Sequence, residues 1–329
     1  MISIFGGSGF IGNKLAELFA RDNQAFEILD ISLNTKLKKN TKICNVSDKE
    51  SIKKSLNGDV IINLAAVHRD DIKPKLLYKK VNVDGAINIC EAAEQNNISK
   101  IIFLSSVAIY GFADSNADEN TKPNPFNEYG KTKLEAEGIF KSWYEKDPKN
   151  RTLVIIRPTV VFGEQNRGNV YNLLLQLNRR NFPMIGNGKN VKSMAYVDNV
   201  ASFIKYSLGL ANGMHIYNYI DKPDLELIDF VSLSRKNLGK DPKPLITLNF
   251  GIALFLGYVL DLISFITRLP LPLSSIRVKK FCSSSQFNTA ISETGFVAPY
   301  TLEEGIKKTI KYEFLEDNSN QDVFESEWF

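Results

Sequence analysis

The sequence predicts an α/β protein built on a doubly wound parallel sheet. Short apolar segments suited to buried strands alternate in the first half with longer segments of helical periodicity. Glycines follow the first of these strands directly, and small or hydroxyl-bearing residues follow two later ones. Because the carboxyl ends of parallel strands meet at one edge of a sheet, these residues are expected to line a common crevice.

Length and composition indicate an ordinary globular chain without a nucleic-acid partner. The 329 residues can form one large domain or two unequal ones. The formal net charge of +4 is too small to indicate nucleic-acid binding by itself. Three scattered cysteines and two histidines indicate neither a disulfide framework nor a metal site. The N-terminus lacks the pattern of a signal peptide, so we expect a cytoplasmic protein.

The first predicted strand, residues 1–5, leads through a glycine-rich turn into a helix. Gly6, Gly9 and Gly12 are spaced G-x-x-G-x-x-G instead of the usual G-x-G-x-x-G. Glycines permit a tight turn and let the backbone approach a pyrophosphate, and a helix N-terminus offers free N–H groups to that anion. The strand and helix on either side favour a dinucleotide-binding fingerprint over a glycine-rich turn that binds nothing.

The second predicted strand, residues 26–30, ends in Asp30. This residue lies 18 positions after Gly12, close to the ~20 expected for a carboxylate that holds an adenine ribose. Such a carboxylate accepts from the ribose hydroxyls and repels a 2′-phosphate, and no arginine follows closely. NAD is therefore favoured over NADP. The alternative is a solvated turn aspartate.

Two later strands, residues 59–66 and 101–106, end in residues suited to a ligand crevice. Small side chains at the first leave room for a ligand, and two hydroxyls at the second are expected to point into the same crevice. His68 follows in a polar loop, where it either contacts substrate or is simply solvated. The residues predicted at these strand ends are Leu64, Ala65, Ala66, Ser105 and Ser106.

Tyr129 and Lys133 lie four residues apart in a segment predicted to be helical, with no proline before Pro148. Residues at this spacing share one helix face. The lysine charge stabilises the tyrosinate, and a phenol with a lowered pKa can act as a general base or acid near neutral pH. The pair by itself is common, so an ordinary surface helix is the alternative. The glycine turn and the strand-end serines supply the deciding context.

Together these motifs resemble the extended short-chain dehydrogenase/reductase superfamily, in its NAD-dependent sugar epimerase/dehydratase branch. The motifs stand in the family's order: the glycine turn, two serines before Tyr110-Gly111, and the tyrosine–lysine pair. The resemblance implies a Rossmann-type NAD-binding domain over residues 1–160, to which later segments return. It also implies a smaller, discontinuous substrate lobe, mainly residues 161–315. The acidic tail, residues 316–329, is expected to be mobile.

The resemblance implies a role for each matched residue. Tyr129 would exchange the proton of the sugar hydroxyl, Lys133 would hold the nicotinamide ribose and lower the tyrosine pKa, and Ser106 would hydrogen-bond the reacting oxygen. The implied NAD-binding residues are Gly6, Gly9, Phe10, Ile11, Gly12, Asp30, Asn45, Val46, Leu64, Ala65, Ala66, Asn82, Ser105, Tyr129, Lys133 and Pro158. The implied substrate-binding residues are His68, Ser106, Asn169, Lys192, Arg277 and Lys280.

Within this branch the chain is similar to bacterial epimerases that act on undecaprenyl-diphospho-N-acetylglucosamine. The shared stretches are residues 66–71, 167–173, 192–197, 217–224 and 274–282. The resemblance implies 4-epimerisation to the N-acetylgalactosamine form through a 4-keto intermediate, for O-antigen and lipopolysaccharide synthesis, and often a homodimer. The Arg-x-Gly-Asp element of UDP-sugar epimerases is absent. Two alternatives remain. One is a soluble UDP-sugar 4-epimerase or dehydratase, and the other is a catalytically inactive NAD-binding protein.

An apolar segment, residues 245–273, has a core at 250–267 that approaches the ~18 residues of a transmembrane span. Asp261 near its middle would cost ~2.5 kcal/mol or more there. The segment is a span, a buried core helix, or a helix in the bilayer interface with basic residues near anionic head groups. We favour the interface, at the cytoplasmic face of the inner membrane, because it suits a polyprenyl-linked substrate. The basic residues are Arg268, Arg277, Lys279 and Lys280.

Overall fold

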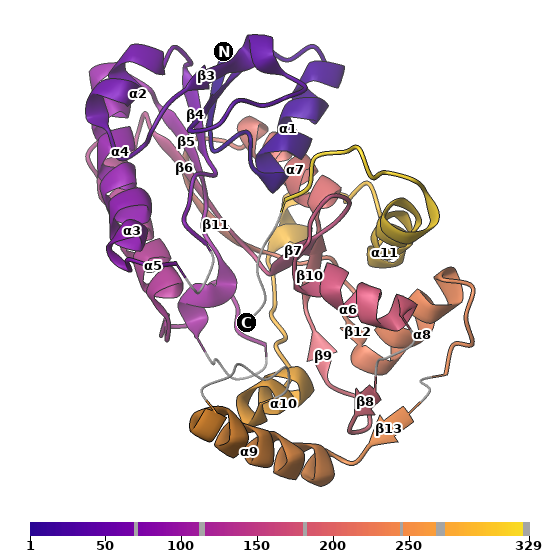
Figure 1. Ribbon diagram of the computed structural model, residues 1–329. Helices are drawn as coiled ribbons and strands as arrows, with labels where there is room; N and C mark the ends of the chain where they lie inside the picture. Colours follow the sequence, from indigo (N-terminus) through magenta and orange to yellow (C-terminus); the bar gives the residue numbers. More distant parts are fainter. Residues whose placement is uncertain (69–71, 112–115, 180–182, 244–245, 268–273, 325–329) are drawn as a thin grey trace.

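A seven-stranded parallel sheet organises the structure, with strand order β11-β6-β5-β4-β1-β2-β3 (Figure 1). This is a computed structural model that describes residues 1–68, 72–111, 116–179, 183–243, 246–267 and 274–324. The sheet strands are β1 (Ile2–Phe5), β2 (Phe26–Asp30), β3 (Thr41–Ile43), β4 (Val60–Asn63), β5 (Lys100–Leu104), β6 (Thr152–Pro158) and β11 (Gly213–Tyr219). The predicted doubly wound parallel sheet is confirmed.

Helices cover both faces of the sheet. One face carries α2 (Lys49–Ser55), α4 (Gly85–Gln95) and α5 (Glu128–Glu145), and the other carries α1 (Phe10–Arg21) and α7 (Val197–Tyr206) (Figure 1). The strands are apolar on both faces because each face packs against helices. The second half of the chain supplies β11, an edge strand of the sheet, and α7, which packs on one face of it.

The smaller lobe consists of short strand pairs and helices around a separate apolar core. The pairs are β7 (Val160–Phe162) with β10 (Met194–Tyr196), β9 (Val191–Lys192) with β12 (Leu225–Glu226), and β8 (Pro183–Ile185) with β13 (Ile246–Leu248). The helices that share this core are α6 (Asn169–Asn178), α8 (Leu227–Asn237) and α11 (Leu302–Ile310). Shorter helical segments are η1 (Lys38–Asn40), α3 (Leu76–Tyr78), η2 (Lys79–Asp84), η3 (Val107–Tyr110), η4 (Ser207–Gly209), η5 (Ile291–Thr294) and η6 (Lys311–Leu315).

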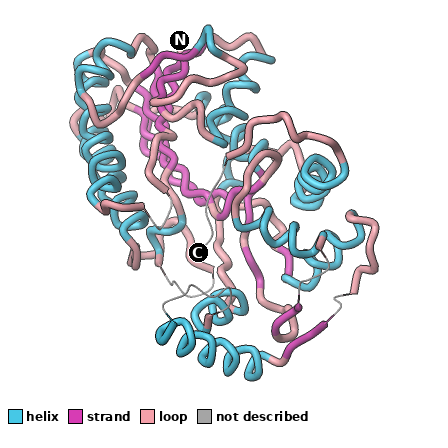
Figure 2. Tube along the Cα trace, viewed as in Figure 1, coloured by secondary structure: helices cyan, strands magenta, loops and turns pink. Residues whose placement is uncertain are grey.

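Two helices, α9 (Phe250–Thr267) and α10 (Ser275–Cys282), form a pair apart from the sheet (Figure 2). Only 11% of α9 is buried, so the interpretation as a buried core helix is wrong. Of the described helices, α9 alone is long and apolar enough to cross a membrane, judged by length and composition only. Arg268, one of the predicted basic residues, lies outside the described residues.

The acidic tail departs from the expectation of a mobile segment as far as it is described. The Phe324 N–H donates to the Gln165 carbonyl at 2.7 Å, and the Phe324 carbonyl accepts from the Arg167 N–H at 2.8 Å. The Phe324 ring lies 5.8 Å from that of Phe10, centroid to centroid. The composition of the tail did not predict these contacts of Phe324, which are two backbone hydrogen bonds and one aromatic contact. Residues 325–329 lie outside the described part.

Candidate active site

The glycine turn after β1 fits a dinucleotide pyrophosphate. A Cβ at Gly6, whose φ is +74°, would lie 2.6 Å from the Ala65 nitrogen, so the turn packs directly on the end of β4. A Cβ at Gly12 would lie 2.5 Å from the Gly6 carbonyl oxygen, so α1 packs directly on the turn. Gly9 is the N-cap of α1, and no described side chain caps it. The first N–H groups of α1 are thus available to an anion.

Asp30 lies beside this turn, where the prediction requires an acid. Its Oδ2 accepts from the Ser8 N–H at 2.9 Å, and its Oδ1 accepts from the Ser32 N–H at 3.2 Å. Oδ1 also accepts from the Ser32 hydroxyl at 3.3 Å, whereas Oδ2 can accept a further hydrogen bond. The residue is therefore placed to accept from a ribose bound at the turn, and that role stays a prediction.

The other predicted cofactor residues have varied environments. Phe10 and Ile11 open α1 and are half-buried, whereas Asn45 is exposed just after β3. Val46 is buried, and Pro158 is buried at the end of β6. Of these five residues, Phe10, Ile11 and Asn45 have solvent-exposed surface, and the contact of all five with the cofactor stays a prediction.

Asn82 anchors the backbone that leaves β4. Its Oδ1 accepts from the Val67 N–H at 2.8 Å, and its Nδ2 donates to the Val67 carbonyl at 3.0 Å and to the Thr132 hydroxyl at 3.0 Å. Asn82 lies in η2, a π-helical turn of the kind often found at functional sites. It thus connects the segment after Leu64-Ala65-Ala66 to α5, and its contact with the cofactor stays a prediction.

Tyr129 and Ser106 lie on two turns in close contact. Tyr129 is in the first turn of α5, whose N-cap Asn127 accepts from the Gly130 N–H at 2.8 Å. A Cβ at Gly130 would lie 2.5 Å from the Ala108 carbonyl oxygen, so η3 contacts α5 directly at this glycine. Ser106 is the N-cap of η3, and its Oγ accepts from the Ala108 N–H at 3.1 Å. Its hydroxyl proton can therefore be donated to another oxygen.

Lys133 is buried one turn further along α5. Its Nζ donates to the Leu104 carbonyl at 2.5 Å, the one acceptor it has among the described residues, and lies 4.2 Å from the Phe103 ring centroid. Burial lowers the pKa of Lys133 to about 7, and the negative charge of Glu137 opposes this shift. An ammonium has three N–H groups, so it retains donors for a cofactor hydroxyl.

A buried network that the sequence reasoning missed supports this site. Glu137 accepts from the Ser105 hydroxyl at 2.6 Å and from Arg157 Nε at 2.9 Å and Nη2 at 2.7 Å. Arg157 Nη1 donates to the Tyr110 hydroxyl at 2.7 Å, which donates to Asn218 Oδ1 at 2.9 Å. The expectation that both serine hydroxyls point into the crevice is therefore wrong for Ser105, because the buried carboxylate requires its hydrogen bond. The available signal was a charged residue on the buried face of α5.

The predicted substrate residues fall into two groups. Lys192 on β9 donates to the Lys280 carbonyl of α10 at 3.0 Å, and burial lowers the pKa of Lys192 to about 8. The Lys280 ammonium lies 5.8 Å from the ring centroid of Phe126, three residues before Tyr129. The structure thus brings α10, with β9 bound to it, to the segment that leads into α5.

The remaining predicted substrate residues lie at the ends of separate segments. Arg277 is in the first turn of α10, and its N–H donates to the Ser274 hydroxyl at 3.2 Å. His68 is exposed after β4, and Asn169 is exposed at the first residue of α6. Their contact with substrate stays a prediction.

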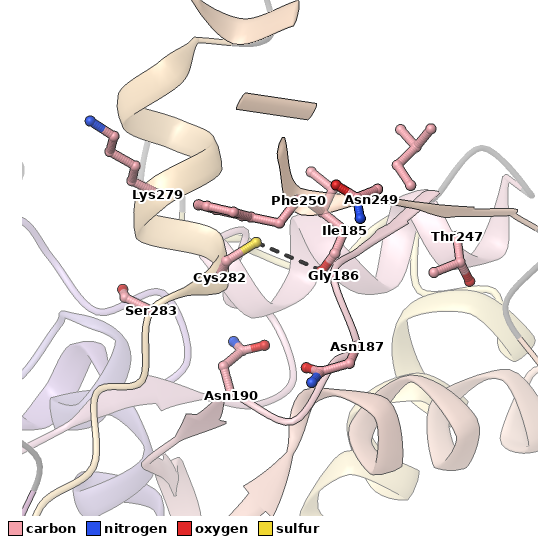
Figure 3. Close-up of a pocket in the computed structure, with 11 residues that line it drawn as sticks. Ile185, Gly186, Asn187, Asn190, Thr247, Asn249, Phe250, Lys279, Cys282 and Ser283 are labelled. Atoms are coloured by element: carbon pink, nitrogen blue, oxygen red, sulfur yellow. Dashed lines mark hydrogen bonds between the residues drawn. The ribbon is translucent and has the colours of Figure 1, made fainter. Parts of the chain in front are cut away.

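A cavity of about 860 Å³ lies apart from this chemistry, between the strands β8 and β13 and the ends of α9 and α10 (Figure 3). The Phe250 ring lies beside α10 near Cys282, whose Sγ is 3.7 Å from the Ile185 carbonyl oxygen, and Lys279 points away (Figure 3). None of the predicted catalytic residues lines it. We therefore do not place the reaction there.

Comparisons with known proteins show the family of this chain. Residues 2–218 match the model of the NAD dependent epimerase/dehydratase family. The chain is 45% identical, over 99% of both sequences, to the N-acetyl-α-D-glucosaminyl-diphospho-ditrans,octacis-undecaprenol 4-epimerase of Escherichia coli O157:H7.

Solved structures share the fold at low identity. A Thermotoga maritima UDP-glucose 4-epimerase with UDP-glucose has a TM-score of 0.73 at 18% identity, covering 96% of this chain and 99% of that one. A Thermus thermophilus UDP-glucose 4-epimerase in complex with NAD has a TM-score of 0.70 at 19% identity, covering 94% and 98%. The family match contains the glycine turn, the strand-end serines and the tyrosine–lysine pair, and the chain accordingly belongs to the NAD-dependent epimerase/dehydratase family.

Proposed function

We propose that the protein is an NAD-dependent 4-epimerase that interconverts undecaprenyl-diphospho-N-acetylglucosamine and undecaprenyl-diphospho-N-acetylgalactosamine. The observation that carries the proposal is the contact of η3, which follows its N-cap Ser106, with the first turn of α5, the helix that carries Tyr129 and Lys133. The near-full-length similarity to the E. coli enzyme supports a lipid-linked substrate. The reaction would serve the synthesis of O-antigen and other surface polysaccharide.

Each catalytic side chain has one task in this proposal. Tyr129, as the phenolate, removes the proton of the hydroxyl on carbon four, and Ser106 donates a hydrogen bond to the same oxygen. Lys133 in its ammonium form stabilises the phenolate and holds a ribose hydroxyl. The glycine turn and Lys133 would hold NAD, which would supply the hydride acceptor at carbon four and the donor to the opposite face of the 4-keto sugar. As the carbonyl is reduced, Tyr129 gives its proton back to the oxygen on carbon four, which completes the new hydroxyl and regenerates the phenolate.

The substrate diphosphate is proposed to contact the basic residues of β9 and α10. The Lys192 ammonium donates to the backbone carbonyl of Lys280. The Lys280 ammonium lies near the ring of Phe126, three residues before Tyr129. Because the lipid tail of this substrate remains in a bilayer, we place the protein peripherally at the cytoplasmic face of the inner membrane. A homodimer is also proposed, from the family resemblance, and sedimentation would test it.

A paired assay tests the substrate. Purified protein with NAD and detergent receives either the undecaprenyl-diphospho-linked or the UDP-linked N-acetylglucosamine, and the sugars are separated after mild acid. N-acetylgalactosamine from the lipid-linked substrate alone supports the proposal. Product from the UDP-sugar alone would return the protein to the nucleotide-sugar epimerases, and accumulation of NADH would indicate a net dehydrogenase.

Tyr129→Phe is the matched test of the chemistry. The variant should bind NAD as the wild type does and lose at least ~10²–10⁴-fold in turnover, because the general acid and base is gone. Tyr144→Phe, on the same helix but remote from η3, is the control. Normal turnover by Tyr129→Phe would disprove the assignment.

A further inference from the structure

The outward face of α9 is a continuous apolar surface. Seven residues at helical spacing form it, and each is 38–70% exposed. They are Ile252, Phe255, Leu256, Val259, Leu262, Ile263 and Ile266. Single exposed apolar residues are common on proteins, but a whole helix face of them marks an interaction site.

The opposite face of α9 packs on α10. Ala253 and Gly257 are its buried residues, and a Cβ at Gly257 would lie 2.8 Å from the Ser275 nitrogen. Asp261 lies on this same face, where its Oδ2 accepts from the Ser275 N–H at 3.1 Å. The acid that would oppose contact with lipid is therefore turned inward, at the N-terminus of α10, where a negative charge is stabilised.

Positive charge borders the apolar face. Arg277, Lys279 and Lys280 lie on α10, and Asp261 is the sole acid in the two helices. The Lys279 ammonium donates to the Tyr258 hydroxyl at 2.9 Å. A tyrosine and lysines beside an apolar surface are typical of the boundary between lipid tails and head groups.

We propose that α9 and α10 together form a hairpin that docks on a bilayer containing anionic lipids, with α9 lying in the membrane plane. A span is disfavoured because α10 runs along α9 and would take three cations into hydrocarbon. A second copy of the chain is disfavoured as the occupant, because a symmetric contact through this face brings the cations of both copies together without acids to pair with them. A bilayer with anionic lipids offers an apolar interior to the exposed face of α9 and a negatively charged surface to the cations of α10.

The docked hairpin also orients the active site. Lys280 is near Phe126, three residues before Tyr129, so the end of α5 that carries Tyr129 would lie close to the head groups that α10 contacts. A diphosphate held at head-group level would then be within reach of the site. This orientation rests on the proposed function, whereas the docking itself does not.

Vesicle flotation of the full-length protein, without substrate, tests the docking. We expect binding to phosphatidylcholine vesicles containing phosphatidylglycerol, weaker binding to phosphatidylcholine alone, and loss of the difference in high salt. Phe255→Ser with Leu262→Ser should reduce the partition coefficient at least about tenfold. Val297→Ser, which removes an apolar side chain that is 84% exposed elsewhere, should change nothing.

Depth measurements distinguish the in-plane orientation. Ile252→Trp, Val259→Trp and Ile266→Trp place probes at the two ends and the middle of the apolar face, and the wild type supplies the background from its two tryptophans. Equal shallow quenching by brominated lipids at all three sites supports the proposal. Deeper quenching at position 259 than at both ends would overturn it in favour of insertion across the bilayer.

Other outcomes are equally decisive. Equal binding to neutral and anionic vesicles, or unchanged binding by the Phe255 and Leu262 double variant, would overturn the docking surface. A dimer that this double variant dissociates would assign the face to a second copy. Because these experiments contain no sugar substrate, the docking can fail while the paired epimerase assay succeeds, and the reverse.

Discussion

Gly130→Ala should separate the catalytic groups without removing any of them. The new Cβ would lie 2.5 Å from the Ala108 carbonyl oxygen, whereas ordinary contacts begin at 3.4 Å. The turn η3 would therefore have to move about 0.9 Å away from α5, taking Ser106 with it. A misplacement of about 1 Å can cost about 10²-fold in rate, and we expect a loss of turnover of that order.

The matched control is on the same helix. Among the described residues, nothing lies within 4 Å of a Cβ at Gly138, which is exposed. Gly138→Ala should keep full turnover and gain up to ~1 kcal/mol in stability from helix propensity. Gly130→Ala has the same propensity gain, so a lower Tm in that variant would report the overpacking, which typically costs ~1–3 kcal/mol.

The assay is single-turnover epimerisation with NAD bound, together with NAD titration and thermal unfolding. NAD affinity should be unchanged by Gly130→Ala, because the glycine turn lies between β1 and α1 and has no contact with Gly130. Wild-type turnover in this variant would refute the argument that close contact between η3 and α5 positions Ser106. Loss of NAD binding along with turnover would indicate general disruption instead.

Three further substitutions test the affinity for NAD, the preference for NAD over NADP and the pH dependence of NAD binding. Gly6→Ala should abolish NAD binding in calorimetry, because its Cβ would meet the Ala65 nitrogen at 2.6 Å; wild-type affinity would contradict that geometry. Asp30→Ser should shift the NAD-to-NADP affinity ratio roughly tenfold toward NADP by removing a repelling charge, and an unchanged ratio would assign Asp30 to the turn. NAD affinity should fall as pH rises through about 7, where Lys133 loses its proton. Glu137→Gln should move that fall to lower pH, because the carboxylate raises the lysine pKa; an unmoved midpoint in titrations against pH would refute the coupling.

The buried network around Glu137 illustrates what local patterns omit. Its partners Ser105 and Arg157 lie 32 and 20 residues away, and Tyr110 connects it to Asn218 across 108 residues. A helical pattern indicates that position 137 faces inward. It does not indicate which donors meet the carboxylate, because that depends on how β5, β6 and β11 are ordered in the sheet.

The apolar segment of α9 illustrates the same limit. Hydropathy measures the preference of side chains for an apolar environment. The hydropathy of this segment is the same whether the segment forms a core helix, a span or an interfacial helix. The contacts of Ala253, Gly257 and Asp261 with α10 decided which face is covered, and so which face is left exposed.

The sequence by itself determined the parallel sheet, the glycine turn at Gly6, the acid at the end of β2 and the helix that carries Tyr129 and Lys133. These features are local, since strand and helix periods, turn residues and short spacings act within about twenty positions. Only the tertiary structure decided that η3 contacts α5 at Gly130, that Ser105 serves the buried carboxylate, and that the tail reaches Phe10. Such contacts join segments distant in sequence, and the free energy that selects them comes from packing, which residue spacing does not encode.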